Sequence, residues 1–179
     1  MPPGGFPSTE DRLGEGEPEL PALTEKTAPT SLRMVTGTGE QLVAQCLAWI
    51  AEKPAETGAQ RAWQYYVLRY VVAHNAKPTQ KAEFFVNLDR LVNEHGVEGV
   101  ILRLNTYFDA PPFPCQGGSK DFGRFVKFFD QLAGTPTSAI VRTLAFEEAA
   151  SNWLATANGH AKRIPSEILA LMTKKEVPY

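Results

Sequence analysis

Three basic residues, Lys120, Arg124 and Lys127, recur at helical spacing in a segment predicted to form a helix over residues 120–133. Positions i, i+4 and i+7 share one face of a helix, and the phenylalanines of this segment occupy the opposite face. A row of three cations over about two turns can contact the phosphates of a nucleic acid. The same row also fits the charged solvent face of any amphipathic helix. With two further basic residues near the C-terminus, the candidate nucleic-acid-binding residues are Lys120, Arg124, Lys127, Lys162 and Arg163.

Cys115 precedes this predicted helix and begins a glycine-rich stretch. A helix N-terminus lowers the pKa of a thiol, which a nucleophilic cysteine needs, but the sequence places no base beside Cys115. The run Gly117–Gly118–Ser119–Lys120 resembles a phosphate-binding loop. It lacks the preceding buried strand and the Gly-x-x-x-x-Gly-Lys spacing, so a hinge followed by a helix cap explains it better.

The other residues that could do chemistry are scattered along the chain. His74, His95 and His160 each fall near the end of a predicted helix, where a cation satisfies exposed carbonyl groups. Cys46 falls on an apolar helix face, where a thiol packs as a small hydrophobic group. No two histidines are four residues apart, as ligands on one helix face would be. We therefore expect no catalytic residue, no metal or cofactor site and no enzymatic activity.

The elements that must position these residues are predicted to be helices. After Thr36, apolar residues recur every three to four positions, and proline or glycine interrupts the pattern at intervals. Gly96 suits a left-handed helix end, and Thr79 and Ser166 suit helix caps. No alternating run beside a hairpin turn predicts a sheet. We expect an all-α fold, a compact bundle of six or seven short helices within residues 36–179, with helices over 39–53, 59–75, 80–95, 98–109, 120–133, 138–158 and 166–174.

The N-terminal segment differs in composition from the rest of the chain. Residues 1–33 contain six prolines, four glycines and only five large apolar side chains. Six acids and three bases give these residues a net charge of −3, whereas the following 146 residues carry 15 bases and 14 acids. Such a segment buries too little apolar surface to offset its ordering entropy. We expect residues 1–35 to form an extended or disordered acidic arm whose apolar side chains bind a partner, namely Phe6, Leu13, Leu20 and Leu23.

Composition excludes several classes of protein. The chain has 179 residues, enough for one domain with a tail, and 43% of them are apolar, as in ordinary globular domains. No apolar run approaches the length of a membrane-spanning helix, and the N-terminus does not have the pattern of a secretory signal. Two cysteines favour a reducing compartment over a disulfide scaffold. The net charge of −2 argues against a polycation that coats nucleic acid.

Residues 65–134 contain three features in order: an aromatic and acidic residue after the fourth predicted helix, a short glycine loop and a phenylalanine-rich helix that ends in leucine. They appear as Tyr107-Phe108-Asp109, Gly117-Gly118-Ser119, and Phe122, Phe125, Phe129 and Leu132. In these features the segment resembles a small helical domain of bacteriophage proteins, found in replication-initiator and helicase-loader-like chains. The resemblance implies contact with DNA or a helicase, no chemistry of its own, and a location in the host cytoplasm or the virion.

Three hypotheses on function follow. The first is a non-enzymatic accessory of DNA transactions, a replication or helicase-loader-type factor that binds DNA, a protein partner or both. The second is a structural or assembly component of a virion or multiprotein complex, whose N-terminal arm binds a neighbouring chain and which could be oligomeric. The third, an enzyme centred on Cys115, has no substrate that the sequence suggests.

Overall fold

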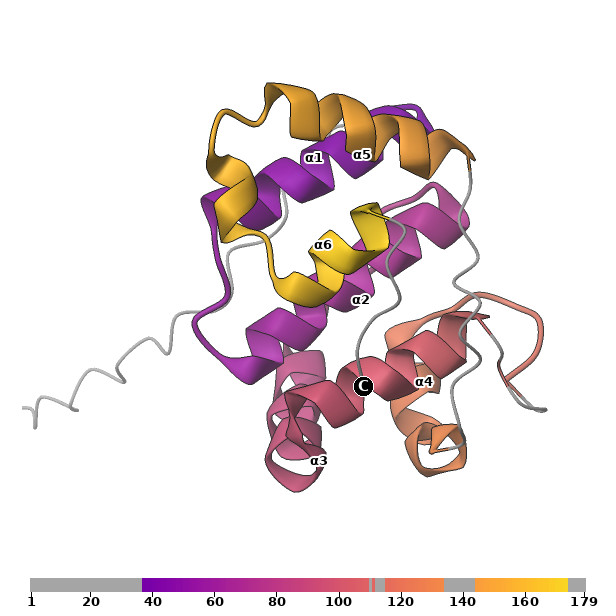
Figure 1. Ribbon diagram of the computed structural model, residues 1–179. Coiled ribbons are helices and arrows are strands. Elements are labelled where there is room, and N and C mark those ends of the chain that lie inside the picture. The colour runs from indigo at the N-terminus through magenta and orange to yellow at the C-terminus, as the bar shows by residue number, and fades with distance from the viewer. Residues whose placement is uncertain (1–36, 110, 112–114, 134–143, 174–179) are drawn as a thin grey trace, which may run out of the picture.

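The computed structural model describes residues 37–109, 111, 115–133 and 144–173. Six α-helices and two 3-10 helices form this part of the chain, and it contains no strand (Figure 1). The all-α prediction is therefore confirmed. Residues 1–35 of the expected arm lie outside the described residues, and so do its four candidate partner-binding side chains, Phe6, Leu13, Leu20 and Leu23.

Helix α2 (Gly58–His74) forms the centre of the bundle, and eight consecutive residues from Ala62 to Arg69 are buried. A helix that is buried on all sides needs partners all around it. Helices α1 (Gly39–Glu52) and α3 (Ala82–Asp109) both contact α2. Their packing leaves α2 surrounded, so its side chains can fix elements on several sides of the fold.

The remaining elements form two groups on this frame. Helix α5 (Leu144–Thr156) and the 3-10 helix η2 (His160–Arg163) contact α1, and α6 (Ser166–Met172) contacts α5. Helix α4 (Phe122–Lys127) and the 3-10 helix η1 (Phe129–Leu132) contact α3. Figure 1 shows α1 and α5 at the top of the view and α3 and α4 at the bottom.

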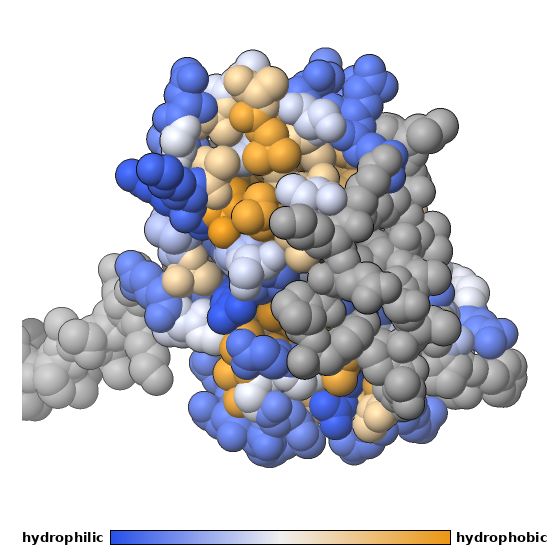
Figure 2. Space-filling view, in the orientation of Figure 1, coloured by the Kyte–Doolittle hydropathy of each residue, from blue (hydrophilic) through white to orange (hydrophobic). Residues whose placement is uncertain are grey.

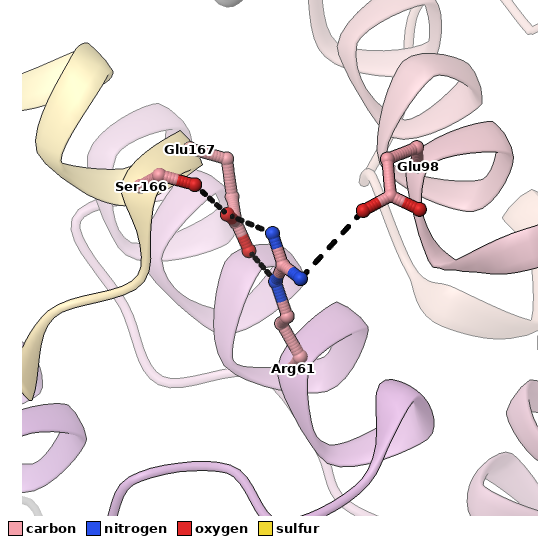
Figure 3. A network of polar contacts seen from close by, with 4 residues as sticks. All are labelled: Arg61, Glu98, Ser166 and Glu167. Carbon is pink, nitrogen blue, oxygen red and sulfur yellow. Dashed lines mark hydrogen bonds and ion pairs between the residues drawn. The ribbon is translucent and has the colours of Figure 1, made fainter.

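An ion-pair cluster ties α6 to α2. Arg61 near the start of α2 donates from Nε and Nη2 to the two carboxylate oxygens of Glu167 in α6, at 2.5 and 2.6 Å. Its Nη1 lies 3.6 Å from Oε1 of Glu98 in α3, and Ser166 Oγ donates to Glu167 Oε2 at 3.2 Å (Figure 3). The guanidinium group of Arg61 thus joins three helices.

The apolar core is rich in aromatic rings. The Phe122 ring of α4 lies 5.5 Å from the Trp63 ring, 5.1 Å from the Tyr66 ring and 4.9 Å from the Phe84 ring. Phe122 therefore joins α4 to both α2 and α3 through pair geometries that aromatic rings favour. Cys46 is fully buried in α1, which confirms the prediction that it packs as a small hydrophobic residue.

The surface exposes few large apolar side chains. Among the described residues, Val86 in α3 and Leu169 in α6 are the exposed examples. Figure 2 shows apolar atoms around α6 near the middle of this face, with polar residues around them and along the lower edge. Single exposed apolar residues are normal on a protein surface. Within the described ranges, no helix is long and apolar enough to span a membrane.

Gly96 interrupts α3 where a helix end was predicted, but its conformation is not the predicted left-handed helical one. Its φ of 73° and ψ of 160° are non-helical, and the helices predicted over 80–95 and 98–109 lie on either side of it. The first of them begins at Ala82, so Thr79 is too far away to cap it. The predicted helices over 39–53 and 59–75 match α1 and α2 to within one residue at each end.

Three predictions at the other helix ends are wrong. Helix α6 begins at Ser166 itself, with Pro165 at the cap position, so Ser166 does not cap it. His160 begins η2 and does not end a helix. The helix predicted over 120–133 is divided into α4 and η1, because the Asp121 side chain caps α4 and Phe128 leaves the helical conformation. The predicted helix over 138–158 includes α5, and residues 138–143 lie outside the described residues.

We expect Gly96→Ala to lower the free energy of unfolding by about 1–3 kcal/mol, because a side chain strains the backbone at this φ and ψ. A Cβ at Gly96 would meet no atom within 4 Å, so the cost comes from the backbone alone. Gly99→Ala is the matched control. Its Cβ would make ordinary contacts at 3.5 and 3.6 Å inside the helix, so it should stabilise α3 by up to about 1 kcal/mol. Urea unfolding measures the free energy of unfolding of both variants. Equal values for Gly96→Ala and Gly99→Ala would contradict the backbone strain expected at position 96.

Candidate functional site

Residues 115–121, which precede α4, form a loop that we call the anchored loop. Its tip is exposed from Gln116 to Ser119, and Gly117 and Gly118 both have a φ of 73°. Non-glycine residues rarely adopt this conformation, so the two glycines permit the shape of the tip. The ends of the loop, in contrast, contact buried side chains of α2 and α3.

Three ring side chains hold the backbone of Lys120 and Asp121. Tyr66 Oη donates to the carbonyl oxygen of Lys120 at 3.0 Å, and Tyr107 Oη donates to that of Asp121 at 3.1 Å. The backbone N–H of Lys120 donates to His74 Nε2 at 3.3 Å. Burial raises the pKa of Tyr66 and of Tyr107, so both phenols remain protonated donors. The backbone of the loop is therefore fixed from two helices.

His74 can accept this hydrogen bond only while its imidazole is neutral and carries its proton on Nδ1. Burial lowers the pKa of His74, and the nearby Lys120 ammonium lowers it further. Its ring centroid also lies 4.5 Å from that of Tyr70. The imidazole therefore acts at neutral pH as a hydrogen-bond acceptor that joins the end of α2 to the loop.

The side chains of Lys120 and Arg124 turn back toward the loop. Lys120 Nζ donates to the carbonyl oxygen of Cys115 at 3.3 Å and lies 4.9 Å from the Tyr107 ring centroid. Arg124 Nη1 donates to the carbonyl oxygen of Gly117 at 3.0 Å. Burial lowers the pKa of Lys120, the charge of Arg124 lowers it too, and Cys115 raises it. These two cations therefore lie against the loop backbone.

The predicted row of three cations on one exposed helix face is wrong in its geometry. Lys120 precedes the helix, because Asp121 occupies the cap position and α4 begins at Phe122. Lys120 and Arg124 are half-buried, whereas Lys127 is exposed, with Nζ 5.4 Å from the Phe128 ring centroid. The three cations belong to one short stretch of chain, but they surround a loop and a single turn of helix.

The structure does not bring the other two candidate cations to this site. Lys162 and Arg163 are exposed in η2, which contacts α1. Figure 1 shows η2, in gold between α5 and α6, at the upper left, and α4 at the lower right. The five predicted residues therefore form two separate basic groups.

Cys115 does not have the surroundings expected of a nucleophile. It is fully buried, and α4 begins seven residues after it, so Cys115 does not directly precede the helix. Among the described residues, no group of three or more histidine, cysteine, aspartate or glutamate side chains could hold a metal ion. Neither observation suggests a chemical step at the loop.

A buried polar network, which sequence reasoning missed, lies at the end of α3 that leads into this loop. Arg69 of α2 donates from Nη1 to Asn105 Oδ1 at 2.9 Å and from Nη2 to Asp109 Oδ1, with which it forms an ion pair. Tyr65 Oη also donates to Asn105 Oδ1. Asp109 is the last residue of α3, so the network fixes the point at which the chain leaves the helix. The signal in the sequence was a polar residue, Arg69 or Asn105, at a position that the helical spacing places among apolar neighbours.

The chain matches no protein-family model, no curated protein and no solved structure. A proposal on function therefore depends on the anchored loop and the cations beside it. The loop combines a fixed backbone with an exposed tip, which is how many binding sites are presented on a rigid scaffold.

We expect the folded state to lose stability on going from about pH 7.5 to about pH 5.5, and His74→Gln to remove part of this loss. Because the pKa of His74 is lowered from 6.5, the unfolded chain takes up the proton more readily. The stability that neutral His74 contributes is present above about pH 6.5 and is lost as the pH falls through its folded pKa. Urea unfolding at both pH values measures the change, with the exposed His160→Gln as control. Equal losses in the two variants would contradict the assignment to His74.

Proposed function

We propose that the chain is a non-enzymatic accessory protein of DNA transactions, of the replication or helicase-loader type, that contacts DNA phosphates with the anchored loop and α4. The observation that supports this proposal is an exposed glycine tip on a fixed backbone, with Lys120, Arg124 and Lys127 around it. A protein partner such as a helicase and a place in the host cytoplasm belong to the same proposal.

The three cations contribute in different ways. Lys127 is exposed and available to a phosphate, and the half-exposed guanidinium of Arg124 lies at the loop tip. Lys120 holds the loop through Cys115 and adds its charge to the local field. Two acids, Asp121 and Asp130, belong to the same stretch of sequence, so the three cations exceed the acids by one positive charge. The contact is therefore weak and does not read the base sequence, because phosphate contacts position a protein without specifying bases.

Salt-dependent binding of labelled single- and double-stranded oligonucleotides tests the proposal. We expect binding to weaken between about 50 and 200 mM salt, and Lys127→Ala to reduce the slope of log K against log salt by about 0.9 on duplex DNA and 0.7 on single strands. Lys162→Ala is the matched control, since Lys162 is an exposed lysine in the other basic group. No measurable binding at the lower salt, or equal slopes in the two variants, would overturn the phosphate contact.

A further inference from the structure

We infer that the acidic N-terminal segment of this chain occupies the anchored loop and competes with DNA for it. This inference rests on the proposed function and adds its regulation. Three features support it: the place where the N-terminal segment leaves the bundle, its length, and the charge of the two partners.

The N-terminal segment joins the bundle close to the anchored loop. Helix α1 begins at Gly39, and a Cβ built on Gly39 would lie only 2.8 Å from Asn75 Oδ1. Asn75 caps the C-terminus of α2 and directly follows His74, whose imidazole accepts the N–H of Lys120. The start of α1 therefore lies one residue away from a side chain that holds the loop.

The length of the segment is sufficient to reach the loop. Eighteen residues separate Glu19 from Thr38, the cap of α1. Extended, these residues span about 60 Å, and as a flexible coil their root-mean-square span is about 25 Å. A tether of this length gives the acidic residues an effective concentration on the order of millimolar at nearby sites. Weak pairing is therefore enough to populate the contact.

Charge favours the contact. Residues 10–19 contain five acids and one base, whereas the loop and α4 carry three bases and one acid, Asp121. Carboxylates accept charge-assisted hydrogen bonds from lysine and arginine, as phosphates do. Several cations elsewhere in the described chain already pair with carboxylates, namely Arg61, Arg69, Lys81 and Arg90. Lys120, in contrast, contacts the neutral carbonyl oxygen of Cys115, which a carboxylate can replace.

The first test removes the charge of the segment in the full chain. We expect a variant in which four glutamates become glutamine to bind DNA about three- to tenfold more tightly, because more of the protein has its loop uncovered. The changes are Glu10→Gln, Glu15→Gln, Glu17→Gln and Glu19→Gln. A control variant removes four exposed charges elsewhere in the chain, through Glu52→Gln, Glu56→Gln, Asp89→Asn and Glu148→Gln. An equal gain in the control would show a general charge effect and overturn the inference, as would no gain in the first variant.

The second test does not depend on DNA. Zero-length carbodiimide cross-linking joins a carboxylate to a lysine in contact with it, and peptide mapping identifies the pair. We expect cross-links from glutamates of residues 10–19 to Lys120 or Lys127, and their loss when DNA is added. Cross-links to Lys162 alone, or none to the loop and α4, would overturn the inference. If these cross-links form but neither the unchanged chain nor the four-glutamate variant binds DNA, the proposed function fails and the contact within the chain stands.

Discussion

Arg69→Ala should lower the free energy of unfolding by about 3–5 kcal/mol, because it leaves the carboxylate of Asp109 buried without its cation. The side chain of Arg69 is 6% exposed and that of Asp109 is 3% exposed, so water screens neither charge. The variant also removes a donor to Asn105 and the stacking of the guanidinium 5.3 Å from the Phe108 ring centroid.

Two further variants separate the charge from the rest of the network. Tyr65→Phe removes one donor to Asn105 Oδ1, which still accepts from Arg69, so we expect a cost of about 1 kcal/mol. Burial raises the pKa of Tyr65, so the neutral phenol is the group that this variant deletes. The double variant Arg69→Met and Asp109→Leu removes both charges and should be more stable than Arg69→Ala alone.

Urea unfolding followed by circular dichroism at neutral pH measures all three variants. A cost below about 1 kcal/mol for Arg69→Ala would mean that the pair is solvated, as a surface ion pair is. If Arg69→Ala does not fold, a double variant that does fold would still show that the unpaired charge of Asp109 causes the loss. A double variant that is no more stable than the single one would contradict the buried-charge explanation.

Local patterns in the sequence were sufficient to predict α1, α2 and the break in α3. Apolar residues at helical spacing predicted α1 and α2 to within one residue, because that spacing depends only on neighbours along the chain. Gly96 marked the break in α3, since few other residues adopt its φ. Thr57 and Gln60 also carried a usable signal, a capping box at the start of α2.

The same reasoning failed at α4 because it followed the apolar pattern past a competing local signal. Asp121 is a favoured cap residue, and its side chain accepts the N–H of Arg124 at 2.8 Å, which makes Phe122 the first helical residue. The spacing of Phe125, Phe129 and Leu132 suited both a continuous helix and a helix that tightens into a 3-10 turn. Reading Asp121 as the cap would have removed Lys120 from the predicted row of cations.

The anchors of the loop could not be predicted from the sequence, because each joins residues that are far apart in it. Tyr66 lies 54 positions from Lys120, and His74 lies 46 positions from it. Only the packing of α2 against α3 and α4 brings these side chains to the loop. Similarly, helical spacing predicted one shared face for the three cations, whereas Lys120 precedes α4 and both Lys120 and Arg124 turn toward carbonyl oxygens of the loop.

Arg61→Ala is the second change with a large expected effect, a loss of about 2 kcal/mol in the free energy of unfolding. Glu167 is 4% exposed and accepts two hydrogen bonds from Arg61, so the variant leaves a buried carboxylate without its cation. The guanidinium itself is 32% exposed, which is why the expected loss is smaller than at Arg69. Ser166 still donates to the carboxylate and offsets part of the cost.

The ion pair keeps Arg61 charged. The hydrogen bonds that Arg61 donates to Glu167, together with the charge of the carboxylate, raise the pKa of Arg61. Arg61→Ala therefore removes a full positive charge from beside the buried carboxylate at neutral pH.

Glu98→Gln is the matched control, because the Glu98 side chain is 77% exposed and its carboxylate lies 3.6 Å from the same guanidinium. An exposed pair contributes little, so we expect a change below about 0.5 kcal/mol. Urea unfolding of both variants at neutral pH provides the comparison. Equal deficits in Arg61→Ala and Glu98→Gln would show that Arg61 joins α2 to α6 no more strongly than a surface charge does. A larger deficit in Arg61→Ala assigns the attachment of α6 to the buried carboxylate of Glu167.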